Sequence, residues 1–283
     1  LPPPPVHFVG DGFRVHNFIP GVHPLSMQRM DPFIMLDYNS RYYFSPTGKP
    51  RGVGVHPHRG FETVSIAYRG RIAHHDSFGN SGVIGEGDVQ WMTASSGLLH
   101  KEYHEKEFAR RGGDFHMVQL WVNLPAKFKM SPPKYQPITN DQMGRFILPD
   151  AWGSNEIISG EHPGVKGPAS TFSPVSLMNA RLNAGGRASF VFPASNNTAL
   201  LVVEGEIQVN GTDRVPADHL VLFRNDGERF EILAGESAIV LIMSGEPLRE
   251  PIAAHGPFVM NTRAEIQQAF EDVSSGKFGR LDD

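Results

Sequence analysis

The stretch VGVHPHRGFETVS, residues 53–65, places His56 and His58 on either side of a proline, with Glu62 four residues further on. On a β-strand, residues two apart lie on the same face, about 6.5 Å from each other. Two imidazoles placed in this way can reach one metal ion at about 2.1 Å each. A lone HxH motif also occurs often in surface turns, so the interpretation depends on the rest of the chain.

Short alternating runs on both sides of this stretch predict two sheet-rich parts. Before about residue 124 they include ETVSIAYRGRIAHH and GDFHMVQLWVNLP, each bounded by glycine, proline, asparagine or aspartate. After a looser segment, strands resume in TALLVVEGEIQVNG and ERFEILAGESAIVLIMSG. We therefore predict an all-β chain, with a first domain over residues 1–130, a linker over 131–170 and a second domain over 171–283.

The tail NTRAEIQQAFEDVSSGKFG changes from a strand period to a helical one. Four apolar residues are spaced for one helical face: Ile266, Ala269, Phe270 and Val273. Thr262 and Glu265 have the spacing of a capping box, and Gly276 is the expected stop of the helix. The second domain is therefore expected to end in a helix.

Composition and charge exclude several classes of protein. The 283 residues contain no cysteine, so disulfides, thiolate metal ligands and a cysteine nucleophile are excluded. With 26 basic and 30 acidic side chains the net charge is −4, which offers no electrostatic footprint for direct nucleic-acid binding. No apolar run reaches the 18 or so residues of a membrane span, and the first residues do not have the pattern of a signal peptide. We expect a cytoplasmic protein.

The two halves resemble each other, which indicates a duplicated domain. ETVSIAYRGRI aligns with NTALLVVEGEI, and this places Gly70 over Gly205. The aligned pairs around the histidines are His56–Val191, His58–Pro193, His100–Phe230 and Glu102–Ile232. The second copy is apolar where the first is ionisable, so these positions are predicted to face the interior of each domain.

Interior imidazoles and a carboxylate need a partner, because burying an unpaired polar group costs about 2–7 kcal/mol. A metal ion supplies one. His100 and Glu102 repeat the two-residue spacing of His56 and His58 on what should be a different strand. The sequence therefore predicts a metal site formed by three histidines and one glutamate.

Alternatives for the fourth ligand remain open at this point. Glu62 lies on the same strand face as His58 if no bulge intervenes, and His104 continues the alternation past Glu102. The motif HHD, which runs from His74 to Asp76, is interpreted as a surface or rim feature, because adjacent residues on a strand face opposite ways.

HPHRGFETVSIAYRG, GDVQWMTASSGLLHKE, QLWVNLP and EPIAAHGPFVMNTRAEIQQAFEDVSSGKFG together resemble the pirin family of the cupin superfamily, over nearly the whole chain. The resemblance implies two antiparallel jelly-roll barrels in tandem, with a metal in the first. The family's metal ligands carry over onto four positions: His56, His58, His100 and Glu102. The resemblance also implies that Glu62 is not a metal ligand. Its side chain is expected either to orient an imidazole or to point outward.

The resemblance further implies activity as a quercetin 2,3-dioxygenase, which opens a flavonol with dioxygen and releases carbon monoxide. The ion expected is Fe(II), while Ni, Co, Mn and Zn also suit these donors. Glu102 would be both ligand and general base. The alternative is a metal- and redox-dependent regulatory protein, either a transcriptional co-regulator or a modulator of a metabolic enzyme, which acts through a protein partner. A monomer is expected.

Overall fold

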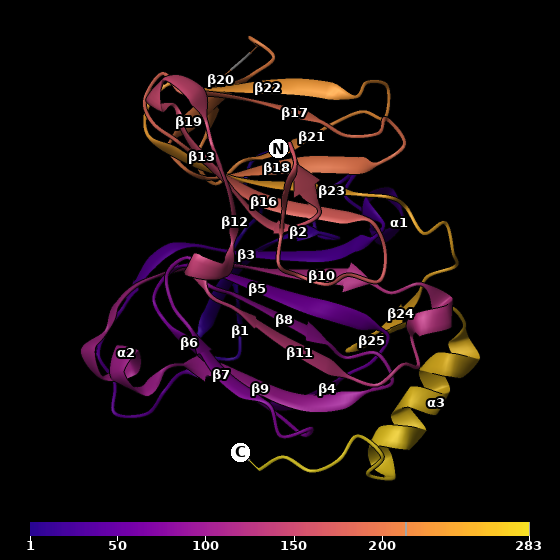
Figure 1. Cartoon of the computed structure of the whole chain (residues 1–283). Helices are drawn as coiled ribbons and strands as arrows, with labels where there is room; N and C mark the ends of the chain where they lie inside the picture. The colour runs from indigo at the N-terminus through magenta and orange to yellow at the C-terminus, as the bar shows by residue number, and fades with distance from the viewer. Residues whose placement is uncertain (213, 283) are drawn as a thin grey trace. The chain divides into compact units, whose positions relative to one another are not determined.

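The computed structural model describes residues 1–212 and 214–282, and the chain divides into two compact units. The larger unit comprises Pro4–Gln28, Phe33–Asn140 and the chain from Leu248 onward. The smaller unit comprises Leu1–Pro3, Arg29–Pro32 and Asp141–Pro247. Each unit is built mainly from antiparallel sheets (Figure 1), as the sequence predicts.

The larger unit contains two sheets that enclose a barrel interior. The seven-stranded sheet has the order β1 (His7–Val9), β2 (Phe13–Ile19), β3 (Phe33–Phe44), β10 (Gly113–Asn123), β5 (Phe61–Arg69), β8 (Val89–Thr93) and β11 (Lys134–Ile138). The four-stranded sheet has the order β4 (Gly52–His58), β9 (Leu98–His104), β6 (Ile72–Asp76) and β7 (Ser81–Ile84). Side chains of the two sheets bond to each other across the interior, at Glu102 for example.

The opening stretch forms β4, a tight turn and the start of β5. Gly60 in the turn has a φ of +93°, and a Cβ there would lie 1.9 Å from the carbonyl oxygen of Val259. Only glycine allows this close approach of two backbone segments. The turn is thereby joined to β24 (Ala253–His255) and β25 (Phe258–Met260), a hairpin far along the chain.

The smaller unit repeats the two-sheet plan. Its six-stranded sheet has the order β12 (Gly144–Ile147), β13 (Gly153–Ser159), β16 (Val175–Leu182), β23 (Ala238–Gly245), β18 (Asn197–Glu204) and β21 (Leu220–Leu222). Its four-stranded sheet has the order β17 (Arg187–Val191), β22 (Arg229–Ala234), β19 (Glu206–Val209) and β20 (Arg214–Pro216), and a small hairpin joins β14 (Glu161–His162) to β15 (Val165–Lys166). The strand order β17-β22-β19-β20 matches β4-β9-β6-β7, so the predicted tandem of cupin barrels is confirmed.

Helices are few and short. They are α1 (Met27–Met30), α2 (Lys106–Arg111), α3 (Arg263–Ser274) and the 3-10 turns η1 (Ala126–Phe128), η2 (Asn140–Gln142) and η3 (Pro149–Ala151). The capping box of Thr262 and Glu265 is present at α3, although Phe270 on the expected apolar face is 43% exposed. Among the helices of the described residues, none combines the length and apolar character needed to cross a membrane.

The compact units differ from the boundaries expected at residues 130 and 171. The expected linker contains β11, which completes the seven-stranded sheet, and β12 to β15, which belong to the smaller unit. The C-terminal segment from Leu248, with α3, belongs to the larger unit, although the smaller unit precedes it in the chain. Arg59 explains this packing, because its guanidinium is buried and bonds to Asp272 of α3 at 2.9 Å.

Candidate metal centre

Three neighbouring strands of the four-stranded sheet place the candidate ligands. β4 pairs with β9 so that His56 lies opposite His100, and β9 pairs with β6 so that Glu102 lies opposite His74. Since alternate residues of a strand share a face, the ionisable side chains of these three strands point into the barrel together.

His56, His58 and His100 meet as the sequence predicts. Each offers a ring nitrogen, and the three nitrogens lie within 4.8 Å of one another. The ring centroids are 4.2 Å apart for His56 and His100, 4.7 Å for His58 and His100, and 4.8 Å for His56 and His58. One ion at ordinary Zn–N or Fe–N distances fits such a triangle of nitrogens.

Backbone carbonyls orient two of these imidazoles. Nδ1 of His56 lies 2.8 Å from the carbonyl oxygen of Gly54, and Nδ1 of His58 lies 3.4 Å from that of Pro257. Each Nδ1 can donate its proton there, which leaves the Nε2 lone pair for an ion. This is the usual arrangement around a metal-binding histidine.

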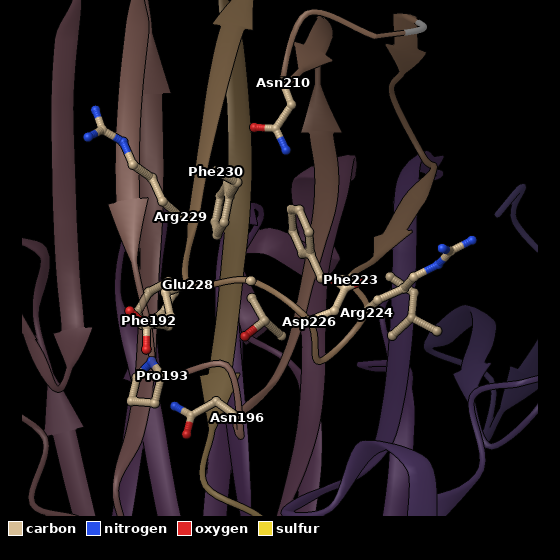
Figure 2. Close-up of a pocket in the computed structure, with 13 residues that line it drawn as sticks. Phe192, Pro193, Asn196, Asn210, Phe223, Arg224, Asp226, Glu228, Arg229 and Phe230 are labelled. Carbon is tan, nitrogen blue, oxygen red and sulfur yellow. The ribbon is translucent and has the colours of Figure 1, made fainter.

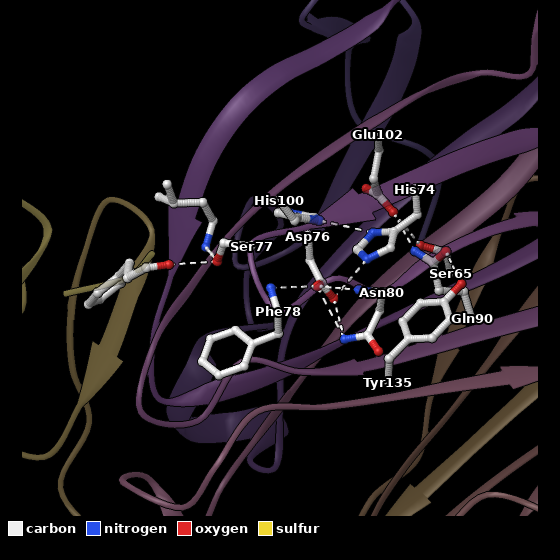
Figure 3. Close-up of polar contacts among 12 residues, drawn as sticks. Ser65, His74, Asp76, Ser77, Phe78, Asn80, Gln90, His100, Glu102 and Tyr135 are labelled. Carbon is white, nitrogen blue, oxygen red and sulfur yellow. Dashed lines mark hydrogen bonds and ion pairs between the residues drawn. The ribbon is translucent and has the colours of Figure 1, made fainter. Parts of the chain in front are cut away.

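The third imidazole is oriented by side chains. Nδ1 of His100 lies 3.5 Å from Nδ1 of His74, whose Nε2 lies 3.3 Å from Oδ2 of Asp76 (Figure 3). His74 and Asp76 are buried, so their interpretation as surface or rim residues is wrong. Only His75 of the motif faces away from the interior, since His74 and Asp76 are two residues apart and share the inward face. Nε2 of His100 is buried without a hydrogen-bond partner in the described part of the chain.

Burial also sets the charge of the cluster. It lowers the pKa of His58 and of His100 well below the ordinary value, and the neighbouring imidazoles lower both further. Both side chains are therefore neutral near pH 7, the form that binds metal. Asp76 is the adjacent anion: burial alone would raise its pKa, but hydrogen bonds from His74 and Asn80 hold that pKa below the ordinary value.

Glu102 reaches the same region and is held by the opposite sheet. Its Oε1 accepts hydrogen bonds from Ser65 at 3.2 Å and Gln90 at 2.9 Å, and its Oε2 accepts one from Gln119 at 2.7 Å. A carboxylate oxygen of Glu102 lies within 4.8 Å of ring nitrogens of both His74 and His100, in a second group of candidate ligands that shares His100 with the first. The sequence did not predict His74 as a member of such a group.

The two alternative ligands lie elsewhere. Glu62 and Ser65 are three residues apart in β5, so their side chains lie on opposite faces of the sheet. Ser65 faces the interior, and Glu62 faces outward, where it accepts a hydrogen bond from Thr93 at 2.7 Å. His104 does face inward, but it lies among Phe44 and Phe115 with Nε2 2.7 Å from the carbonyl oxygen of Gly12. Burial lowers the pKa of His104 to about 4.

A cavity borders the centre on the side of His56 and Glu102. Gln119, Asp37 and Asn39 form a polar part of its wall, whereas residues of β1, β2 and β4 form an apolar part. Trp91 is fully buried in the core, whereas Trp121 is partly buried and stacks on Phe61 beside His58.

The second barrel fills the equivalent space with hydrocarbon. Phe190 pairs with Phe230 in β17 and β22, as His56 pairs with His100 in β4 and β9. The expected counterpart Val191 is instead 65% exposed, so the predicted alignment is wrong by one residue in this strand. The segment from Phe190 to Asn197 at the start of β18 is one residue longer than the segment from His56 to Glu62, which aligns with Asn197, and a shift of one residue reverses the face of every side chain.

At its mouth the second barrel has a small cavity of aromatic character. Phe223 and Phe230 stack there with centroids 4.4 Å apart, and charged side chains such as Arg224, Asp226 and Glu228 surround the opening (Figure 2). No cluster of metal-ligating side chains occurs in this unit among the residues described. The contrast between a polar first barrel and an apolar second one is confirmed.

Comparisons with known proteins agree with this architecture. The family model described as Pirin matches residues 12–122, and the model described as Pirin C-terminal cupin domain matches residues 177–279. A Pseudomonas aeruginosa protein named "Putative quercetin 2,3-dioxygenase" is 46% identical over 274 residues, which cover 97% of this chain and 95% of its own. The human protein named Pirin is 35% identical over 259 residues, 89% of this chain and 84% of its own.

Among solved structures, the crystal structure of quercetin 2,3-dioxygenase from Acinetobacter baumannii superposes with a TM-score of 0.93. It is 45% identical and covers 99% of this chain and 97% of its own. The similarity therefore extends over both barrels.

Proposed function

The chain belongs to the pirin family, and from this premise we propose that it is a metal-dependent dioxygenase that opens flavonols such as quercetin with dioxygen. His56, His58, His100 and Glu102 would hold the ion. The observation that carries the proposal is a cluster of three imidazoles, of which His58 and His100 are buried and neutral, beside a carboxylate and a cavity. The relatives named as quercetin 2,3-dioxygenases support the reaction class.

The donor set fits a divalent ion. Three imidazole nitrogens and a carboxylate suit Fe(II), Mn, Co, Ni or Zn, of which we propose Fe(II). The unpartnered Nε2 of His100 supports this fit, because a buried polar atom without a partner costs free energy that an ion would recover. When bound, the ion supplies a Lewis-acidic centre with open positions for a chelating ligand.

Glu102 has the position of a general base. It borders the cavity, so a flavonol 3-hydroxyl placed there can transfer its proton to a carboxylate oxygen. Gln90, Gln119 and Ser65 fix the direction of that carboxylate before the substrate binds. Overall, one flavonol and one dioxygen give one carbon monoxide and one ring-opened ester, which takes up both oxygen atoms.

Oxygen uptake tests this proposal. The iron-loaded protein is mixed with quercetin, and dioxygen loss, flavonol loss and carbon monoxide are measured together. We expect equal amounts of all three, none of them with metal-free protein. Glu102→Gln should lower kcat by roughly 100-fold or more in protein that still contains metal. Full turnover in metal-loaded Glu102→Gln would exclude the base role.

The same assay separates the enzyme from the regulatory alternative. Absence of oxygen uptake in metal-loaded protein, together with a protein partner captured only in the presence of metal, would favour a regulatory protein. The net charge of −4 is in line with a protein rather than a nucleic acid as that partner.

A further inference from the structure

Asn39 is a buried amide whose polar atoms the fold leaves unpaired. It lies in β3, is 1% exposed, and neither Oδ1 nor Nδ2 has a hydrogen-bond partner among the described residues. Buried side-chain polar groups are hydrogen-bonded in the large majority of cases, because an unsatisfied donor or acceptor costs free energy. An amide with both atoms unpaired therefore needs an explanation.

The explanation lies in what Asn39 faces. Asn39 and Asp37 share one face of β3, and they lie opposite Met117 and Gln119 of β10. These four residues line the cavity that also borders His56 and Glu102. The unpaired amide is therefore in the wall of the candidate active site and not in a packed region of the core.

The rest of the wall indicates the kind of ligand. Val9, Phe13, Val15 and Val53 give the cavity apolar surfaces beside its polar ones, the mixture typical of sites for small organic ligands. A primary amide both donates and accepts, and so does a phenolic hydroxyl. Asp37 adds a carboxylate two residues away on the same face, with one oxygen already bonded to Asn17 at 2.7 Å.

We propose that Asn39 is a specificity residue that binds hydroxyl groups on the aromatic ring of the flavonol remote from the metal, with Asp37 as a second acceptor. The inference rests on the proposed function and deepens it by assigning the preferred substrate. That substrate is a flavonol whose aromatic ring remote from the metal, called the second ring below, carries hydroxyl groups. A site built to hydrogen-bond a hydroxyl discriminates strongly against the analogue without it.

The test compares two flavonols that differ only in the hydroxyl groups of the second ring. Quercetin has two, and the analogue has an unsubstituted ring. Dissociation constants are measured for metal-loaded wild type and Asn39→Leu without oxygen, and kcat/KM values with oxygen. We expect the wild type to prefer quercetin by roughly 10-fold or more. Asn39→Leu should lose that preference, through weaker binding of quercetin alone.

Two further variants serve as controls for a change in cavity shape and for poor packing of leucine. Met117→Leu changes the cavity next to Asn39 without removing a polar group, so it should alter both flavonols alike. Asn39→Ala should lose the preference as Asn39→Leu does, which keeps the test valid if leucine does not pack. The melting temperature of metal-free Asn39→Leu should be no lower than that of the wild type, because an unpaired amide has been removed.

The outcomes distinguish the two claims. If wild type and Asn39→Leu both turn over the two flavonols with the same ratio, Asn39 does not select the substrate, although the proposed function stands. If neither flavonol binds to the metal-loaded wild type, both claims fail.

Discussion

Nδ1 of His100 lies 3.5 Å from Nδ1 of His74, and His74 bonds through its other nitrogen to Asp76. The row of three residues crosses from β9 to β6 and is buried along its length. Because the Asp76 carboxylate can only accept when ionised, it favours the tautomer of His74 with a proton on Nε2. His74 can then accept from Nδ1 of His100, and Nε2 of His100 is free to bind the ion.

Replacing Asp76 should therefore weaken metal binding without removing a ligand. We expect Asp76→Asn to lower the affinity for the divalent ion by roughly 10- to 100-fold, because the tautomers of His74 and His100 are no longer fixed. Competition with a chromophoric chelator measures this directly. The exposed helix variant Glu107→Gln serves as control, and an unchanged affinity in Asp76→Asn would contradict the proposed orientation.

Glu62 predicts a pH dependence of stability that is separate from the metal. Burial raises the pKa of Glu62 to about 7 from an ordinary value of 4.5, against the hydrogen bond from Thr93. Between the two pKa values Glu62 ionises in the unfolded chain but not in the native state, which lowers the free energy of unfolding. This loss of stability is absent below pH 4.5, grows between pH 4.5 and 7, and is complete above pH 7. Glu62→Gln should accordingly stabilise the protein by about 3 kcal/mol at pH 8 and little at pH 4.5.

Denaturant unfolding at the two pH values checks this expectation. A gain that is the same at pH 4.5 and pH 8 would mean that Glu62 is not the titrating group. Metal content should not change in Glu62→Gln, since this side chain points to the outer face of the sheet.

Asp272 joins the C-terminal helix to the turn that follows His58. Its Oδ2 accepts a hydrogen bond from the buried guanidinium of Arg59, which also bonds to the carbonyl oxygen of Ser96 at 2.7 Å. Asp272→Ala leaves a buried cation without its partner and should lower the unfolding free energy by about 3–5 kcal/mol. Lys277→Met removes the exposed partner of the same carboxylate and should cost less than about 1 kcal/mol.

Thermal and denaturant unfolding of both variants test this difference. Equal effects of Asp272→Ala and Lys277→Met would contradict a structural role for the buried pair. Removal of the side chain at Asp272 should also increase amide exchange in α3 and β25, because both pack beside Arg59.

Much of the fold could be predicted because its signals are local. Alternation and turn residues mark the strands, and the capping box of Thr262 and Glu265 marks α3. The return of the C-terminal segment to the larger unit could not be predicted, because it depends on long-range pairs such as Arg59 with Asp272. Neither residue has a local pattern that identifies the other.

The candidate ligands of the site could likewise be predicted from local spacing. His56 with His58, and His100 with Glu102, have the two-residue spacing of inward positions, and the apolar second copy identifies that face as interior. The supporting residues were missed because they depend on which strands become neighbours. β6 brings His74 beside β9, and the opposite sheet supplies Gln90 to Glu102. Polar residues inside otherwise apolar strands, such as the glutamine in DVQWM, are the signal that could have found them.

Metal content is the most direct test of a metal centre built on His56, His58, His100 and Glu102. The protein is purified without chelators and without a polyhistidine tag, and bound transition metals are measured for wild type, His100→Ala and the control His7→Ala, whose histidine is exposed. We predict about one divalent ion per chain in wild type and control, and loss of that ion in His100→Ala. A wild type that binds no metal, or His100→Ala that retains it, would contradict the account.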